Sequence, residues 1–266
     1  SPLMHKSYLY EREHSLKKYN SNDLFLPYAT SLRMSDVGYQ SNIQDSLKIS
    51  YNNLDEFINT LIKGIKTPIK KFKDIGMFDN AGIAQQISMG ILQIENELYD
   101  IVRPKRSGPS GSRPSTLLKT EGIEYLELRG IDINPFIPEG IDINKIKLLD
   151  IYIIHSLVSE SPYMSDAEIK EIKTNQKTMV SEGRVKNTML SKNGDLVSLT
   201  ELRKIFLSEL EQTAKALDEY FDGYLDSFYS EMSKSELPSE KILSDMEAEG
   251  SEFQNYGLIQ SKKIAD

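Results

Sequence analysis

The sequence of 266 residues contains no cysteine, which excludes disulfides and thiolate chemistry, whether at a metal or as a nucleophile. Any metal site is therefore expected to use oxygen ligands. The most apolar run, residues 148–158, is interrupted by Asp150 and His155 and is shorter than the roughly 20 apolar residues that a membrane-spanning helix needs. No charged and then apolar signal peptide opens the sequence. These absences predict a cytoplasmic protein with no membrane partner.

Positive charge is also in short supply. The chain has 32 Lys+Arg against 40 Asp+Glu, a formal net charge of −8. Sequence-independent binding of nucleic acid depends on an excess of cations, so we expect no nucleic-acid partner. The sequence has no glycine-rich phosphate loop of the P-loop or Rossmann kind, no nucleophile elbow and no metalloprotease motif. Those enzyme classes are therefore unsupported.

The overall composition is that of a soluble globular protein, with 39% hydrophobic and 27% charged residues. The length corresponds to between one and two domains. The chain opens on Ser1-Pro2-Leu3 without an initiating methionine, and we expect the sequence to be part of a longer natural chain.

The pattern of apolar residues changes near residue 142, and the two patterns together predict an α+β fold. Residues 22–136 consist mainly of short apolar or alternating runs between turn residues, which indicates a sheet-rich portion over residues 1–142. One helix is expected there, beginning after Asn53 as its N-cap and ending before Pro68. Residues 143–266 are predicted to be helical.

Apolar spacing and capping residues predict where the helices of residues 143–266 begin. Apolar spacing predicts a helix over residues 143–159, and Ser165 and Ser198 each begin a capping box for a further helix. His155 lies within the first of these helices and is expected to be a satisfied buried or boundary residue rather than a metal ligand. The loop at residues 106–115 is either a mobile lid or an ordinary surface loop.

The most informative segment for chemistry is residues 123–129. In a strand, alternate side chains point to opposite faces, so Leu126 and Leu128 can enter a core while Tyr125, Glu127 and Arg129 share the other face. A carboxylate and a guanidinium would then stand side by side. The alternative is a cross-face ion pair on an exposed sheet, which is common and contributes little.

The same alternation appears in residues 93–99, where one strand face would carry Gln93, Glu95, Glu97 and Tyr99. Carboxylates on one face suit Mg²⁺ or Mn²⁺, and Mg²⁺ commonly arrives with nucleotide phosphates. Residues 103–106 (Arg-Pro-Lys-Arg) follow as a compact basic group that either binds phosphate or is simply solvated. Carboxylates that hold a divalent cation and basic residues that bind phosphate are together what phosphoryl transfer needs.

Four segments in this order closely resemble the glutamate–cysteine ligase family of the proteobacterial type. They are LPYATSLRMSDVGY at residues 26–39, LQIENELY at 92–99, IVRPKR at 101–106 and EYLELRGIDINPF at 124–136. The resemblance covers roughly residues 1–160 and corresponds to the second half of that family's chain.

The resemblance implies an ATP-dependent ligase that joins the γ-carboxylate of glutamate to the amino group of cysteine through γ-glutamyl phosphate, the first step of glutathione synthesis. It implies ATP and Mg²⁺ (or Mn²⁺) as cofactors and a glutamine-synthetase-like antiparallel sheet, of which this chain would form part. Carried over by position, Glu127 matches a metal-binding carboxylate, Arg129 an arginine near the transferred phosphoryl group, and Arg33 an arginine that contacts the anionic substrate or phosphate. Tyr39 and Tyr99 match tyrosines of the cysteine pocket, and Glu95 is a further candidate metal ligand.

The first half of the family's chain supplies further metal ligands and parts of both substrate pockets, and nothing in this sequence matches them. The missing N-terminal half is therefore an expected partner, and this chain alone is expected to be inactive. Two alternatives remain. One is a related ligase that joins glutamate to another amine, and the other is a non-catalytic structural or interaction domain that acts through the helical portion.

Overall fold

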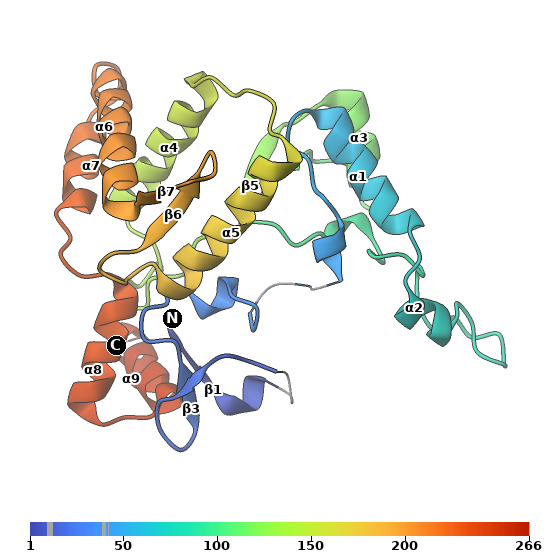
Figure 1. The fold of residues 1–266 in the computed structure, drawn as a ribbon, viewed down its shortest axis with the longest axis horizontal. Coiled ribbons are helices and arrows are strands. Elements are labelled where there is room, and N and C mark those ends of the chain that lie inside the picture. The colour runs from blue at the N-terminus through green and yellow to red at the C-terminus, as the bar shows by residue number, and fades with distance from the viewer. Residues whose placement is uncertain (10–12, 39–40, 42, 266) are drawn as a thin grey trace. The chain divides into compact units, whose positions relative to one another are not determined.

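The computed structural model describes residues 1–9, 13–38, 41 and 43–265. The chain divides into two compact units, one made of Ser1–Gly38 together with Asp132–Asp266 and the other of Tyr39–Ile131. This division differs from the expected boundary between residues 142 and 143, because the first strands of the chain pack on its last helices. The α+β class is as expected (Figure 1).

The first unit contains a small antiparallel sheet with the order β1-β3-β2. Its strands are β1 (Leu3–His5), β2 (Lys17–Lys18) and β3 (Asp23–Phe25). Two C-terminal helices, α8 (Pro238–Glu249) and α9 (Phe253–Ala265), lie beside these strands in Figure 1. Leu3, Ile242, Met246 and Tyr256 form the buried core between them. The C-terminal tail therefore stabilises the start of the chain.

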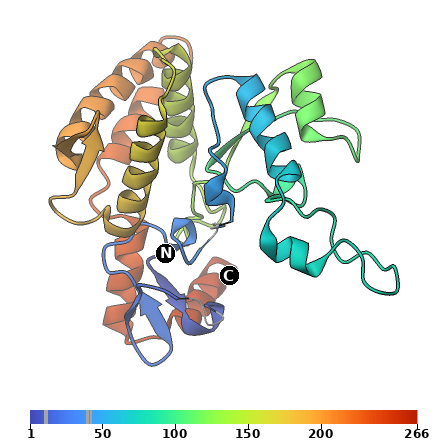
Figure 2. The ribbon, with the colours of Figure 1, turned by 45° about the vertical axis from the view of Figure 1, so that its right-hand side comes forward.

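A helical bundle forms the larger part of this unit. Its helices α4 (Ile143–Val158), α6 (Leu199–Asp218) and α7 (Tyr224–Met232) lie side by side (Figure 2). They enclose a core of four buried residues: Ile151, Leu210, Ala214 and Phe228. The expected helix over residues 143–159 is confirmed. His155 faces α6, where its Nε2 lies 3.6 Å from Glu209 Oε2, and it is a boundary residue as expected.

Helix α5 (Asp166–Glu182) and a short hairpin complete the unit. The two serines begin their helices as N-caps, as predicted, since Ser165 Oγ accepts from Glu168 N and Ser198 Oγ accepts from Glu201 N. The hairpin strands β6 (Met189–Lys192) and β7 (Asp195–Ser198) were not expected in a helical portion. Asn193 and Gly194 connect them with φ angles of 56° and 87°, the left-handed conformation that a tight two-residue turn requires.

The second unit is built around α1 (Leu54–Lys66). Asn53 Oδ1 accepts from Glu56 N at 2.8 Å, so the predicted cap is confirmed, and the helix ends before Pro68. Its apolar face is buried, with Phe57, Ile58 and Leu61 in a core that also contains Leu92, Leu98 and Leu118.

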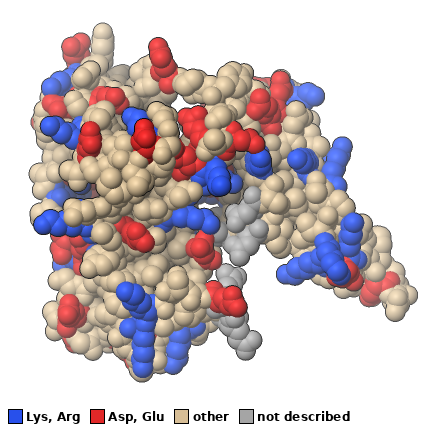
Figure 3. Space-filling view, in the orientation of Figure 1, with Lys and Arg blue, Asp and Glu red and all other residues tan. Residues whose placement is uncertain are grey.

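Two further helices lie where strands and loops were expected, α2 (Lys70–Ile75) and α3 (Pro114–Glu121). Figure 3 shows a group of basic side chains over α2, which carries Lys70, Lys71 and Lys73. The strands β4 (Val102–Lys105) and β5 (Tyr125–Leu128) pair antiparallel. Short 3₁₀ turns occur at Lys6–Tyr8, Leu32–Met34, Gln44–Ser46 and Glu95–Glu97. Among the described residues, no helix is both long and apolar enough to cross a membrane.

Candidate active site

The register of the β4–β5 ribbon brings acidic and basic side chains together. Arg103 lies opposite Glu127, and Lys105 lies opposite Tyr125. Residues directly opposite in an antiparallel pair share a face, so Arg103, Lys105 and Glu127 project on the same side. Arg129 follows the end of β5 and donates from Nη2 to Glu127 Oε1 at 3.0 Å. The expected neighbouring placement of Glu127 and Arg129 is thereby confirmed.

Glu127 is the carboxylate of this cationic ribbon. Its second oxygen, Oε2, lies 3.5 Å from Lys105 Nζ. Burial raises the pKa of Glu127, but the hydrogen bond from Arg129 and the charges of Lys105, Arg129 and Arg103 outweigh it, so the pKa lies below its ordinary value. Glu127 is therefore ionised at neutral pH. The face carries three basic side chains for one carboxylate, an arrangement that favours an anionic ligand.

The ribbon fits a divalent cation in one respect. Glu127 Oε2 is buried and accepts no hydrogen bond, although it lies within ion-pair reach of Lys105. A buried carboxylate oxygen that accepts no hydrogen bond is unusual in a folded protein, and carboxylate oxygen is a ligand that Mg²⁺ prefers. The described part of the chain contains no cluster of three or more acidic or histidine residues that would hold a metal. Glu127 can therefore supply one ligand of such a site and not the whole of it.

The basic group at residues 103–106 is mostly engaged within the protein. Arg103 is 2% exposed and donates to the carbonyl oxygens of Asn96 and Glu95 at 3.0 and 3.3 Å. Arg106 pairs with Glu121 at 3.2 Å. Lys105 remains next to Glu127. Burial lowers the pKa of Lys105, as does Arg103, while Glu127 opposes the shift. Of this group, Lys105 is the best placed to meet a phosphate.

Glu95 has a different place from the one expected. Residues 95–97 form a 3₁₀ turn rather than a strand, so the predicted face with Glu95, Glu97 and Tyr99 in line is wrong. Glu95 is 9% exposed, and its two oxygens accept from Ser115 N and Ser115 Oγ, both at 2.7 Å. Ser115 lies in the first turn of α3, where backbone N–H groups lack helical partners. Glu95 therefore caps α3 in this structure.

Leu126 is a further difference from expectation. It is 46% exposed rather than buried in a core, because β4 and β5 form a ribbon of only two strands in the described chain. Tyr99, expected in a substrate pocket, is partly exposed, and its backbone N donates to Gln44 Oε1 at 2.9 Å. Tyr99, Glu95, Glu127 and Arg129 all belong to the second unit.

Arg33 belongs to the first unit, in the turn Leu32–Met34. Its Nε donates to Asp132 Oδ1 at 2.7 Å. Burial raises the pKa of Asp132, but the nearby Ser31 hydroxyl, the hydrogen bond from Arg33 and the positive charge of Arg33 more than offset this and hold it below its ordinary value. Arg33 is therefore fixed by an ionised carboxylate. Tyr39, the other tyrosine expected in a substrate pocket, lies outside the described residues.

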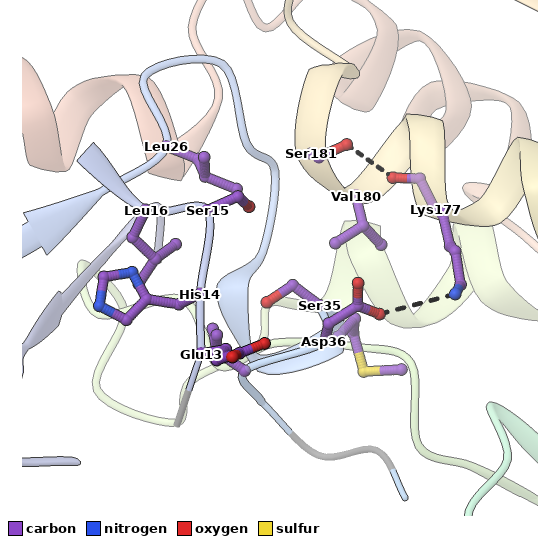
Figure 4. Close-up of a pocket in the computed structure, with 12 residues that line it drawn as sticks. Glu13, His14, Ser15, Leu16, Leu26, Ser35, Asp36, Lys177, Val180 and Ser181 are labelled. Carbon is purple, nitrogen blue, oxygen red and sulfur yellow. Dashed lines mark hydrogen bonds and ion pairs between the residues drawn. The ribbon is translucent and has the colours of Figure 1, made fainter. Parts of the chain in front are cut away.

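A cavity of about 480 Å³ adjoins the segment that follows Arg33. It is formed by residues 13–16, Leu26, residues 34–37 and the α5 residues Lys177, Val180 and Ser181 (Figure 4). Asp36 Oδ1 and Lys177 Nζ lie 3.7 Å apart on its wall. The sequence analysis did not identify Asp36, Lys177 or Asp132. Their only sequence signal is charge, which does not reveal a partner 99 or 141 positions away.

Comparison with known proteins shows which family this chain resembles in sequence and structure. A family model described as glutamate-cysteine ligase matches residues 1–179. A glutamate–cysteine ligase of Alcanivorax borkumensis is 38% identical over 98% of this chain and 52% of its own length, and one of Pseudomonas putida is 37% identical over 100% and 52%. The crystal structure of the Francisella tularensis glutamate–cysteine ligase in complex with AMP matches 99% of this chain and 53% of its own, with 30% identity and a TM-score of 0.89.

These matches define the class first, an α+β fold shared with a solved member of a family of ligases. The chain belongs to the glutamate–cysteine ligase family. It spans about half the length of the curated relatives that it matches.

Proposed function

We propose that this chain forms part of an ATP-dependent ligase that joins the γ-carboxylate of L-glutamate to the amino group of L-cysteine, the first step of glutathione biosynthesis. The observation that carries the proposal is the ribbon face on which Glu127 stands among Lys105, Arg129 and Arg103, in a member of this family. Phosphoryl transfer needs cations that hold phosphate oxygens and a carboxylate that holds a divalent ion.

The proposed chemistry has two steps. A carboxylate is a poor acyl donor, so a γ-carboxylate oxygen of glutamate first attacks the γ-phosphorus of ATP, ADP leaves, and γ-glutamyl phosphate forms. The cysteine amino group then attacks the γ-carbonyl carbon, the bond to the phosphate oxygen breaks, and phosphate leaves with the electron pair as the amine loses a proton. Both steps bring anionic groups together, and this repulsion is what the arginines must offset.

The residues of this chain have separate parts in the proposal. Arg129, with Lys105 beside it, binds the transferred phosphoryl group, and Glu127 orients Arg129 through their hydrogen bond. Arg33 binds the anionic substrate or phosphate, and Tyr39 and Tyr99 line the cysteine pocket. Glu127 would hold Mg²⁺ (or Mn²⁺), which when bound neutralises and orients the nucleotide phosphates. We retain Glu95 in a supporting part only, since its oxygens cap α3.

Adenine nucleotide as the phosphoryl donor is supported by the Francisella tularensis relative, which was solved in complex with AMP. AMP is the portion of ATP that the product ADP retains after the γ-phosphoryl group has been transferred. We propose ATP for this chain on that basis and on the cationic ribbon.

The remaining half of the natural chain is the proposed partner of this one. We propose that it supplies further metal ligands and the rest of both substrate pockets, so that residues 1–266 alone are inactive. The match to about half of each relative supports this proposal, as does the exposure of Tyr125 and Leu126 on a two-stranded ribbon. We propose the cytoplasm as the location, where ATP is available.

The test is a ligase assay on the full-length natural chain. We expect ADP release that depends on glutamate, cysteine and Mg²⁺ together, with γ-glutamylcysteine identified by mass. Residues 1–266 assayed alone serve as the matched control and should give no product. Competition by other amines separates this ligase from a related glutamate–amine ligase, because cysteine should be preferred. Absence of product from the full-length chain would favour a structural or interaction domain.

A further inference from the structure

One arginine beyond the matched family region binds three successive backbone carbonyls of the segment that leads to Arg33. Arg184 donates from Nη2 to Pro27 O and from Nε to Ala29 O at 3.2 Å. Its backbone N donates to the intervening carbonyl, Tyr28 O, also at 3.2 Å. The family model ends at residue 179, so Arg184 lies outside the residues that this model matches.

The environment of Arg184 makes these hydrogen bonds strong. Its side chain is 8% exposed, and its Nη1 lies 3.9 Å from Glu240 Oε1 on α8. Hydrogen bonds from a charged donor contribute more than neutral ones, and the planar guanidinium holds several acceptors in a fixed geometry. A lysine has the charge without that geometry. The carbonyls of Pro27 and Ala29 are therefore held by a group that few substitutions can replace, while Tyr28 O is held by the backbone N.

The next residue, Thr30, attaches the same segment to the end of α5. Thr30 N donates to Val180 O at 2.9 Å, and Thr30 Oγ1 donates to Met179 O at 3.0 Å. Both acceptors lie in the last turn of α5, where carbonyls lack helical partners. Ala29 is fully buried beside them. Residues 27–30 are thus docked on the C-terminal end of α5 through both backbone and side chains.

Arg33 is only three residues further along, and the intervening chain is also fixed. Leu32 is buried, and its backbone N donates to Ser1 O at 2.9 Å. Arg33 itself is held by Asp132. The guanidinium of Arg33 therefore has two supports, Asp132 on its side chain and the docked segment on its backbone. Only the backbone support depends on the helical portion.

We propose that Arg184 is a positioning residue for the ligase reaction, which fixes residues 27–30 on α5 and thereby sets the place of the Arg33 guanidinium. The inference rests on the proposed function, in which Arg33 binds an anionic group. In this proposal the helical portion contributes to the reaction by positioning Arg33, through α5 and the segment that follows α5. Displacement of a binding group by about 1 Å can lower a rate by about 100-fold, so a loosened segment has a measurable effect.

The first test is hydrogen exchange, which needs no activity. In the full-length chain, Arg184→Ala should speed exchange in a peptide covering residues 26–34 by about tenfold or more, since the two side-chain contacts to Pro27 O and Ala29 O are lost. Exchange in a peptide from α1, in the other unit, should not change. Lys186→Ala is the matched control, because this exposed lysine lies two positions away and should leave both peptides unchanged. Unchanged exchange over residues 26–34 in Arg184→Ala would overturn the proposal.

The second test links Arg184 to Arg33 through kinetics. Arg184→Ala should lower kcat/KM for glutamate about 10- to 100-fold, and millimolar guanidinium ion should restore part of the loss by occupying the vacated site. Arg184→Lys serves if the alanine variant does not fold, and it should show an intermediate loss because it retains the charge alone. In an Arg33→Lys background, Arg184→Ala should cause little further loss, as groups that act as a unit are non-additive.

Equal losses in both backgrounds, without rescue by guanidinium, would identify a merely structural role and overturn the proposal. Failure of the proposed function gives a different pattern. In that case the unaltered full-length chain makes no product, while hydrogen exchange still decides whether Arg184 holds the segment.

Discussion

Arg33 Nε donates to Asp132 Oδ1 over 2.7 Å, an ion pair that joins residues 99 positions apart in the sequence. An arginine that must meet an anionic substrate gains from such support, because less side-chain freedom is lost on binding. Asp132 lies three residues after Arg129, within the segment 124–136, and it was not among the site residues that the sequence analysis selected.

The first prediction concerns catalysis by that pair. In the full-length chain, Asp132→Asn should lower kcat/KM for glutamate by about tenfold, because the amide lacks the charge that orients Arg33. Steady-state kinetics with glutamate varied measure the effect. Asp36→Asn is a matched control for the loss of an acidic side chain in the neighbourhood, since its pair with Lys177 is well exposed and contributes little. Equal kinetics for Asp132→Asn and the unaltered chain would show that Arg33 does not need this carboxylate.

The second prediction is the pH dependence of stability that Asp132 contributes. Its pKa is lower in the folded chain than the ordinary value of about 3.9 in an unfolded one. A depressed folded pKa gives stability that is present above the unfolded pKa and is lost as pH falls through the folded pKa. The stability difference between the unaltered chain and Asp132→Asn should therefore be largest above about pH 5 and shrink below about pH 4. Denaturant titrations at several pH values measure it, and a difference that grows on acidification would contradict the assignment.

The third prediction concerns Glu127. Glu127→Gln in the full-length chain should lower kcat by about 100-fold or more and raise the Mg²⁺ concentration needed for half-maximal rate. The fold should persist, because glutamine has nearly the same shape and can still accept from Arg129. Rates over a range of Mg²⁺ concentrations, with circular dichroism as the folding control, provide the measurement. Normal turnover with an unchanged Mg²⁺ requirement would remove Glu127 from the proposed site.

The fourth prediction separates two roles for Glu95. Its oxygens accept from Ser115 N and Ser115 Oγ, so Glu95→Ala leaves buried donors without partners, at a cost of about 1–3 kcal/mol in the free energy of unfolding. The Mg²⁺ requirement of the folded enzyme should stay the same, since the carboxylate serves α3. Denaturant midpoints and Mg²⁺ titrations measure the two quantities separately. A raised Mg²⁺ requirement at unchanged stability would instead restore Glu95 as a metal ligand.

Local signals in the sequence predicted local structure well. The helix after Asn53 and those after Ser165 and Ser198 begin where their caps predict, because a capping hydrogen bond joins residues only three apart. The neighbouring placement of Glu127 and Arg129 was also predictable, because it follows from the two-residue period of a strand. These are the features that need no knowledge of the rest of the fold.

Most predictions that the structure contradicts failed for one physical reason: the residues involved contact partners that are distant along the chain. Alternation in residues 93–99 is typical of a strand, yet Glu95 turns inward because Ser115, 20 positions away, presents donors to it. The packing of β1 and β3 on α8 and α9 joins the two ends of the sequence, and no periodicity reveals that. The β6–β7 hairpin is a different case. Its Asn193-Gly194 turn is a recognised hairpin signal, and the surrounding helical pattern obscured it.

The last prediction concerns the contact that joins those two ends. Asp23 on β3 is fully buried, and its Oδ2 accepts from Asn20 Nδ2 at 2.7 Å and from Phe253 N, the first residue of α9, at 2.8 Å. Asp23→Ala removes the acceptor and leaves the α9 donor without a partner, which should cost about 1–3 kcal/mol in the free energy of unfolding.

Hydrogen exchange in peptides from α9 shows where this effect acts. In the full-length chain, Asp23→Ala should speed exchange at the start of α9 while the α4–α6–α7 bundle keeps its protection, because that bundle has a core of its own. Asn22→Ala is the matched control, since its side-chain contact with Glu252 is exposed and should contribute little. If α9 keeps its protection in Asp23→Ala, the apolar core around Met246 and Tyr256 alone holds the tail, and the carboxylate is dispensable.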